Sequence, residues 1–250
     1  MRTVPRWTRI YLGGYSFANY TQSIGPLEVN FAEADLTTLG DAVKGTLPGQ
    51  PSANIGTLNA VMDNDTNGFR EIMQGGSNSW PTSIAIGMQA EPAAGNPVFA
   101  GYFRQKSYTG AASGELVTVS AEFEGWDAAA SNLYQKFWGK VLHANSAETA
   151  VNSGSGVDSD TAGATTTGGF AIFHLLSSNG TVTLTVQDSA DNSTGWANVT
   201  GLTSGVIDAS STPTAVFAAT VVTATIKRYT RWQLSFGTAS TATFLISFVR

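Results

Sequence analysis

The chain has 250 residues, of which 42% are hydrophobic and only 12% are charged, with a formal net charge of −5 and no cysteine. The absence of thiols excludes disulfides, thiol nucleophiles and cysteine-ligated metals, and the negative charge argues against tight binding to nucleic-acid phosphates. No apolar run reaches membrane-spanning length or suits a signal peptide, so we expect neither.

Apolar and polar residues alternate through much of the first half, a pattern typical of half-buried strands. Strands are predicted at Leu27–Phe31, Ser52–Met62, Ile84–Met88, Val98–Ser107 and Val117–Glu124. Residues 32–50 lack this periodicity and are predicted to form a long loop, which in a compact domain is usually functional. Residues 108–115 are predicted to be the connection between the last two strands.

One short helix is predicted at Asn67–Gln74, after an acidic turn. Asp65 or Thr66 would cap its free backbone N–H groups. Its apolar residues share one face at helical spacing, so packing on a sheet would hold this short helix in place. The residues of that face are Phe69, Ile72 and Met73.

After Trp126 the pattern changes to a polar bridge and then to segments rich in Ala, Ser, Thr and Gly. We therefore predict two domains, at residues 1–130 and 131–250. Short strands separated by regular turn residues are typical of a β-sandwich. In the second domain they are predicted at Phe170–Ser177, Thr181–Gln187, Val216–Lys227, Tyr229–Phe236 and Thr243–Val249.

The order of features over residues 23–126 resembles the major tail tube protein of long-tailed bacteriophages. The resemblance rests on the stretch FAEADLTTLGDAVKGTLPG at 31–49, the strand after it, the acidic turn at 63–65, the short helix and three further strands. The second half loosely resembles jelly-roll or immunoglobulin-like modules of phage structural proteins, on residues 186–191 (VQDSAD) and 228–232 (RYTRW). The fold class expected is all-β with one short helix: a tail-tube-type β-sandwich or barrel domain, then a jelly-roll or Ig-like β-sandwich on the outer surface.

The resemblance implies a structural virion protein of the tail, assembled in the host cytoplasm, and not an enzyme. Six copies would form a ring, and stacked rings would form a tube through which DNA passes during ejection without specific binding. The expected partners are further copies of the chain, a tape measure protein and a tail terminator. No cofactor, metal or membrane is expected.

The polar strand faces supply candidate channel residues. Glu28, Glu122 and Glu124 would line or approach the lumen, where their charge would repel DNA phosphates. Arg104 and Lys106 alternate onto the same face and would pair with carboxylates, which weakens that field. The predicted loop would contact a neighbouring subunit or ring through Asp35, Leu36, Leu39, Asp41 and Lys44.

Residues with catalytic or metal-binding potential have simpler interpretations. His174 lies in an apolar strand without a Gly-x-Ser-x-Gly motif in the chain, so a core histidine is favoured over a triad member. The oxygen-rich segment with Asp188, Asp191 and Asn192 suits Ca²⁺, but a turn in which these side chains bond their own backbone is favoured.

Two other functions remain open. One is a capsid decoration protein, which would form trimers without tubes. The other is a carbohydrate-binding adhesin module, because Trp196, Tyr229 and Trp232 are aromatic residues that can stack on sugars. In a tail protein the same residues are candidates for weak contact with host glycans.

Deleting residues 36–43 tests the predicted loop. We expect a soluble monomer that no longer polymerises, because the contacts to the neighbouring copy are removed while the sheet is kept. Negative-stain microscopy at rising protein concentration measures this, and a deletion variant that still forms tubes would show that the segment is not an assembly contact.

Overall fold

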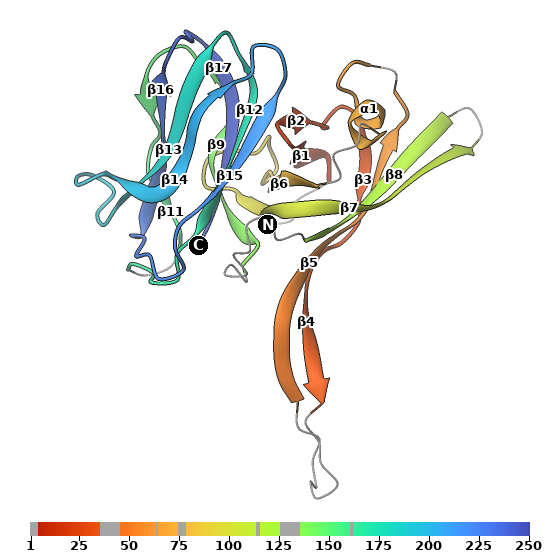
Figure 1. The fold of residues 1–250 in the computed structure, drawn as a ribbon, viewed down its shortest axis with the longest axis horizontal. Helices are drawn as coiled ribbons and strands as arrows, with labels where there is room; N and C mark the ends of the chain where they lie inside the picture. Colours follow the sequence, from red (N-terminus) through yellow and green to blue (C-terminus); the bar gives the residue numbers. More distant parts are fainter. Residues whose placement is uncertain are drawn as a thin grey trace, which may run out of the picture.

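The computed structural model describes residues 5–35, 46–63, 65–74, 79–113, 116–125, 136–160 and 163–250. In these residues antiparallel strands predominate beside one short α-helix, which confirms the all-β fold class (Figure 1). The first half contains η1 (Pro5–Trp7), β1 (Thr8–Leu12), β2 (Tyr15–Ser16), β3 (Thr21–Ile24), β4 (Leu27–Asp35), β5 (Thr46–Val61), α1 (Phe69–Gln74), β6 (Ser79–Ile86), β7 (Pro97–Ser113) and β8 (Leu116–Gly125). The second half contains β9 (Trp138–Glu148), β10 (Asn152–Ser153), β11 (Val157–Asp158), β12 (Phe170–Ser178), β13 (Thr181–Ser189), β14 (Ala197–Asp208), β15 (Thr214–Ala219), β16 (Tyr229–Phe236) and β17 (Ala242–Val249).

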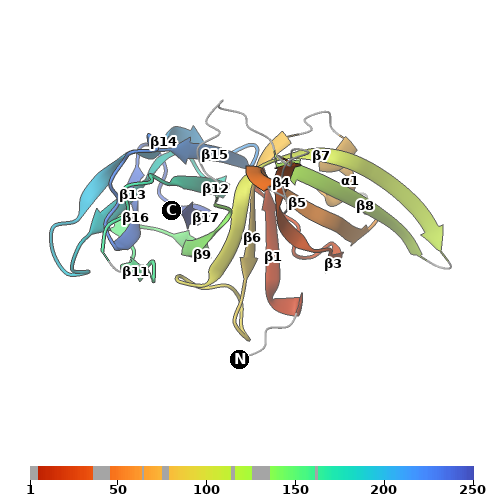
Figure 2. The ribbon, with the colours of Figure 1, turned by 90° about the horizontal axis from the view of Figure 1, so that it is seen from below.

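One continuous sheet runs through both halves. Its order within the described residues is β15-β12-β17-β9-β7-β6-β1-β2, and β8, β5, β4 and β3 join it through β7. The link is the pairing of Pro97–Phe99 in β7 with Trp138–Lys140 in β9. Figure 2 shows the two lobes on either side of β1 and β6. The predicted domain boundary at 130/131 lies outside the described residues.

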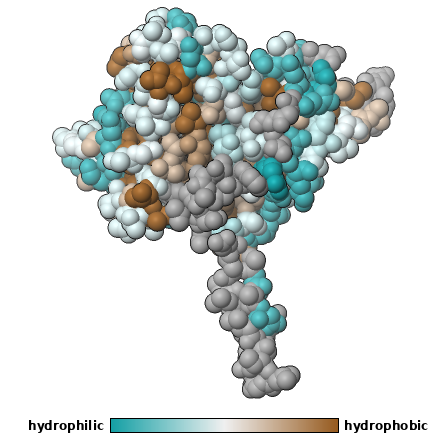
Figure 3. Space-filling view, viewed as in Figure 1, coloured by the Kyte–Doolittle hydropathy of each residue, from teal (hydrophilic) through white to brown (hydrophobic). Residues whose placement is uncertain are grey.

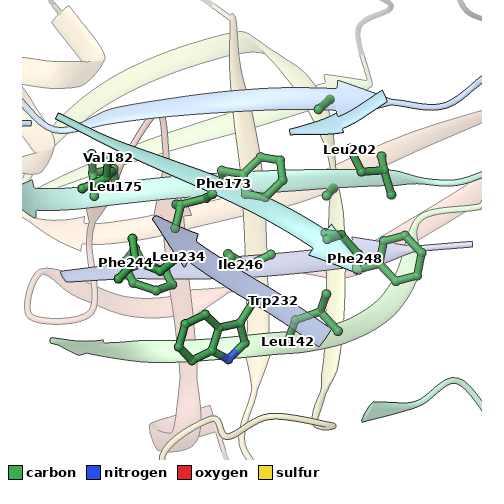
Figure 4. Packing of buried hydrophobic residues seen from close by; sticks show 14 of the residues in the cluster. Leu142, Phe173, Leu175, Val182, Leu202, Trp232, Leu234, Phe244, Ile246 and Phe248 are labelled. Atoms are coloured by element: carbon green, nitrogen blue, oxygen red, sulfur yellow. The ribbon is translucent and has the colours of Figure 1, made fainter. Parts of the chain in front are cut away.

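Three apolar cores hold the layers together. One fills the C-terminal sandwich, between the β12–β17–β9 portion and the second sheet of β10, β11, β16, β13 and β14, and includes Trp232 and Phe244 (Figure 4). Another lies beneath α1 and includes Phe69. The third joins the halves and includes Tyr11 and Phe170. β6 is buried on both faces as a result, unlike the half-buried strand that its alternating sequence predicted.

Several strands are longer than the alternation indicated. Residues 32–35 and 46–50, predicted as loop, extend β4 and β5 into a hairpin that projects from the body (Figure 1). β7 likewise continues to Ser113 through part of the predicted connection at 108–115. β1, β9 and β14 were not predicted, because glycine and charged or small polar residues interrupt their alternation. The strand predicted at Val216–Lys227 ends at Ala219.

The helix α1 packs its apolar face on the sheet as predicted. Its capping differs from the prediction, because the carboxylate of Asp63, not Asp65 or Thr66, accepts the backbone N–H of Arg70 at 3.4 Å. Asp63 also accepts the backbone N–H of Asp65 at 3.2 Å. One side chain therefore closes the acidic turn and the start of the helix together.

A buried polar chain fixes the two halves to each other. The backbone N–H of Gly14 donates to Nδ1 of His174 at 3.3 Å, so the ring proton lies on Nε2, which donates to Oγ of Ser83 at 2.9 Å. Ser83 in turn bonds Ser247 at 2.6 Å. Gly14 has φ +97° and lies so close to the backbone of Thr214 that a Cβ would be 2.5 Å from it, so only glycine fits. His174 is a satisfied core histidine, as predicted.

Replacing the ring by an amide tests this joint. Burial lowers the pKa of His174 from 6.5 to about 3, so between these values the unfolded chain takes up a proton that the folded chain refuses. Stability should fall by about 1.4 kcal/mol for each pH unit below 6.5. His174→Gln should flatten this slope by about that amount in urea unfolding at about pH 6 and about pH 5. Part of the slope should remain, because burial also lowers the pKa of His143. Equal slopes in both proteins would contradict the assignment.

Candidate assembly surface

One face of the β4–β5–β8–β7 sheet is polar from strand to strand. The register places Glu28 beside Asn54, Asn54 beside Glu124, and Glu124 beside Arg104, so four strands contribute one cross-strand row. All four side chains are half-buried or exposed. The predicted channel residues of β4 and β8 therefore lie on the same sheet face.

A bulge at residues 56–57 keeps this face polar along β5. After the bulge Asn59 pairs with Ser120, and its amide donates to Oγ of Ser23 at 2.9 Å. Without the extra residue the alternation would carry Leu58 to the polar face, whereas Leu58 is fully buried in the core. Sequence alternation alone did not reveal this, because the bulge reverses the phase in the middle of the strand.

The charges on the face are partly paired. Arg104 forms an ion pair with Glu124, as the predicted pairing of Arg104 with a carboxylate required. Glu122 accepts the hydroxyl of Thr57 at 3.0 Å, and Glu28 has the amide of Asn30 at 3.5 Å. Glu28 and Glu122 thus form no ion pair within the part of the chain that the structure describes. The surface remains acidic after the pairing of Arg104.

Lys106 does not follow the alternation that was predicted for it. β7 advances from Gln105 to Ser107 while β8 advances only from Phe123 to Glu122, so Lys106 is the extra residue of a bulge. Its side chain is exposed. The neutralisation predicted for this face therefore comes from Arg104, and no ion pair to Lys106 is found among the described residues.

The sheet has two unpaired edges in the part of the chain that the structure describes. β3 and β4 both pair with the same side of β5, and no described strand pairs with their outer side. Residues 105–113 of β7 pair with β8 on one side. On the other side β6 begins at Ser79, opposite Arg104, so no described strand pairs with residues 105–113 there. Unpaired backbone donors and acceptors on such edges can add a strand from another chain.

The two edges match in level and in direction. Residues 107–111 of β7 pair with residues 118–122 of β8. In the same row of the sheet, residues 118–121 of β8 pair with residues 58–61 of β5, and residues 58–60 of β5 pair with β3. Every neighbouring pair in this order is antiparallel, so β7 runs opposite to β3 and β4. A second copy placing β7 beside β3 would extend the same antiparallel sheet.

A groove of about 640 Å³ follows the β3 edge. Its walls come from β1 and from the segment Thr21–Leu27, with Arg6 and Arg9 at one side. The side chain of Arg9 pairs with Glu91. The β3 edge therefore borders a groove whose opposite wall is β1.

The projecting β4–β5 hairpin carries the remaining predicted contacts. Asp35 pairs with Thr46 at the end of β4 and is exposed, so it belongs to a strand and not to a loop. Leu36, Leu39, Asp41 and Lys44 lie outside the described residues. An isolated two-stranded ribbon is marginal in water, so the extended part of this hairpin adds little stability by itself.

The oxygen-rich segment with Asp188, Asp191 and Asn192, at the end of β13, is a turn held by hydrogen bonds to backbone groups. The carboxylate of Asp191 accepts the backbone N–H groups of Ser193 at 3.0 Å and Thr194 at 2.9 Å, and these bonds lower its pKa. Asp188 accepts the backbone N–H of Lys227 at 3.0 Å. Among the described residues no group of His, Asp and Glu is arranged to hold a metal ion.

The aromatic residues considered for glycan contact differ in how far they are exposed. Trp232 is 5% exposed, with its ring against His143 at 4.5 Å, so it cannot stack on a sugar. Trp196 and Tyr229 are half-buried, and their rings contact the guanidinium groups of Arg231 and Arg228.

None of the helices in the described part of the chain has the length and hydropathy of a membrane span.

Comparisons with known proteins find little that is similar. No protein-family model matches the chain, and no curated protein matches it. Among solved structures it is similar to the Dit protein of phage SPP1, described as a paradigm of the hub adsorption apparatus in phages that infect Gram-positive bacteria. The identity is 12% and the TM-score 0.34, over 97% of this chain and 99% of that chain. A TM-score of this size does not establish a shared fold.

Proposed function

We propose that the chain is a structural subunit of a bacteriophage tail, and that copies of it close into rings by joining the β7 edge of one to the β3–β4 edge of the next. The observation that carries this proposal is the pair of unpaired edges, opposite in direction and equal in level, at the two sides of one sheet. No enzymatic role, cofactor or metal is part of the proposal.

Ring closure follows from the strand arrangement. The interface joins two different surfaces, so it is heterologous, and a constant rotation between copies closes it into a ring. At the level of the free β7 edge each copy contributes an even number of alternating strands, β3, β5, β8 and β7, which lets the closed sheet remain antiparallel throughout. Six copies per ring is the number that the tail-tube resemblance implies.

The polar face would then line the channel. The opposite face is covered by the core under α1, so only the face with Glu28, Glu122 and Glu124 is available to line the lumen. Unpaired carboxylates there would keep DNA phosphates from binding to the wall. Rings would stack into the tail tube, with a tape measure protein, a tail terminator and transiting DNA as partners, and the C-terminal sandwich would lie outside.

Proline scanning of the β7 edge tests ring closure. Backbone N–H groups along a strand point alternately to its two sides, so either Thr109→Pro or Gly110→Pro removes an outward donor and leaves the β7–β8 ladder intact. We expect the variant that keeps its melting temperature to remain monomeric in sedimentation velocity. The other variant should lower the melting temperature, and so identifies the inward position. Ring formation in both variants would contradict the proposed edge.

Reversing charge on the polar face tests the channel assignment. Glu28→Lys with Glu122→Lys changes the face by four charges per chain, so assembled particles should retain short duplex DNA at low salt and release it as salt rises. Co-sedimentation with labelled DNA measures this. The matched control makes the same change on exposed β14, with Thr200→Lys, Val206→Lys and Asp208→Lys. If both variants bind the same amount of DNA, and nuclease digests the bound DNA equally in both, the face with Glu28 and Glu122 does not line a lumen.

Microscopy of the unchanged chain separates the remaining functions. Tubes at rising concentration support a tail tube subunit, and rings that never stack would indicate a one-ring position in the tail. Trimers without rings would favour the capsid decoration protein instead.

A further inference from the structure

A row of long polar side chains crosses the outer face of the second sheet, opposite the apolar core of the C-terminal sandwich. Asn198 of β14 is paired with Gln187 of β13, which is paired with Arg231 of β16. Gln233 lies two residues further along β16, beside Thr185 of β13. Figure 3 shows mainly hydrophilic and neutral residues where the β13–β14 connection projects from this lobe. Three neighbouring strands thus contribute to one polar surface.

Hydrogen bonds fix the direction of the three amides in this row. Nε of Arg231 can only donate, and it lies 2.9 Å from Oε1 of Gln187, so the nitrogen of Gln187 faces its other neighbours. That nitrogen donates to Oδ1 of Asn198 at 2.9 Å and to Oε1 of Gln233 at 3.0 Å. Gln187 is 8% exposed, so it holds the row in place from beneath the surface.

This arrangement leaves hydrogen-bond donors on the surface. The amide oxygens of Asn198 and Gln233 are occupied by bonds within the row. Their NH₂ groups and the terminal nitrogens of Arg231 donate to no other group in the part of the chain that the structure describes. Asn198 is exposed, and the other two side chains are half-buried. A ligand of this face must therefore offer acceptor oxygens.

The guanidinium of Arg231 also lacks a counter-charge. No carboxylate of the described residues pairs with it, and partial burial lowers its pKa, because desolvation disfavours the charged form. The carboxylates on neighbouring strands are engaged elsewhere, since Asp188 pairs with Lys227 and Asp158 with Arg228. The carboxylate in the turn after β13 is bonded to backbone N–H groups. An anionic ligand would supply the missing charge through the paired bonds that a guanidinium forms with carboxylate or phosphate.

An aromatic ring adjoins these donors. Trp196 immediately precedes β14, and the guanidinium carbon of Arg231 lies 4.4 Å from the centre of its ring. The tryptophan is half-buried, so part of its side chain is open to a ligand, and sugar rings pack their C–H faces on such surfaces. Asn198 and Arg231 are two strand spacings apart, about 10 Å, a span that a short saccharide with an acid group can bridge.

We propose that this face binds a saccharide that carries a carboxylate or a phosphate group. The acid group binds the terminal nitrogens of Arg231, and the sugar ring packs against Trp196. Hydroxyl oxygens of the sugar accept from the NH₂ groups of Asn198 and Gln233. The site lies on the C-terminal sandwich and uses neither sheet edge of the first half, so it does not depend on the proposed ring.

Saturation-transfer NMR tests the ligand class, because it observes the ligand and works on single copies and on assembled particles alike. The probes are glucuronate, glucose 6-phosphate and glucose. We expect the acidic sugars to bind more tightly than glucose by roughly tenfold or more, since a charge-assisted bond to Arg231 is stronger than a neutral one. Binding of only one acidic sugar would also support the proposal and identify the acid group. Acidic sugars that bind no better than glucose would overturn it.

Two further probes separate a saccharide from a bare acid group. Acetate and methyl phosphate offer the anion without the sugar ring, as an acidic segment of a protein partner would. We expect both to bind more weakly than the acidic sugars, and Trp196→Ala should reduce the affinity for the sugars to that lower level. If acetate and methyl phosphate bind as tightly as the sugars, the saccharide assignment is wrong.

Three variants with the same change in net charge test the residues of the site. Arg231→Gln removes the cation. Asn198→Asp keeps the oxygen that accepts from Gln187 and replaces the outward donor by a negative oxygen. Both should weaken the binding of the acidic sugars by roughly tenfold or more. Lys106→Gln is the matched control, because Lys106 is exposed in the other lobe, and it should bind these sugars as the unchanged chain does.

The exposed position of Asn198 keeps this test independent of folding. Asn198→Asp should retain the melting temperature of the unchanged chain even if Arg231→Gln does not. Undiminished binding of the acidic sugars by Asn198→Asp would overturn the site. Equal losses in all three variants would overturn it as well, because binding would then follow net charge alone.

Discussion

Among the residues that the structure describes, the unpaired backbone of two sheet edges is the constraint on which the rest of the fold depends. The groups that a neighbour can satisfy lie on β3–β4 at one side and on residues 105–113 of β7 at the other. Soluble proteins usually protect such edges with charge, proline or a covering element. Here Pro26 interrupts the first edge and β4 carries the exposed charges of Glu28, Glu33 and Asp35, while the second edge has Lys106 at a bulge among otherwise small or uncharged residues. The proposed ring would satisfy the backbone groups of both edges.

The proposed pairing between copies would also account for features that a monomer does not explain. The β4–β5 hairpin continues beyond the body as a two-stranded ribbon, which has little stability alone. The sheet keeps one face polar across four strands, although a bulge at residues 56–57 is needed to do so. In the proposed tube, a wall that repels DNA and a core that excludes water would impose these opposite demands on the two faces of the same strands.

The C-terminal half is held to the first half as one unit. The shared sheet through β7 and β9, the core with Tyr11 and Phe170, and the bonds from His174 to Gly14 and Ser83 all cross between them. Because His174 at this joint is fully buried and neutral, the folded state is more stable near neutral pH than at acidic pH. In the proposed tube, the C-terminal sandwich would therefore have the same orientation on every copy.

The sequence by itself determined the all-β class, the packed helix face at Phe69, and the placement of Glu28, Glu122 and Glu124 on polar strand faces, because local alternation records which side chains avoid water. The core position of His174 and the turn at Asp191 could also be read from their neighbours in the chain. Only the tertiary structure decided which edges remain unpaired, that β6 is buried on both faces, that Trp232 is internal and that Arg104 pairs with Glu124. These depend on register and on contacts between residues far apart in the chain. A single bulge, as at Lys106, reverses every side chain beyond it without leaving a signal in composition or periodicity.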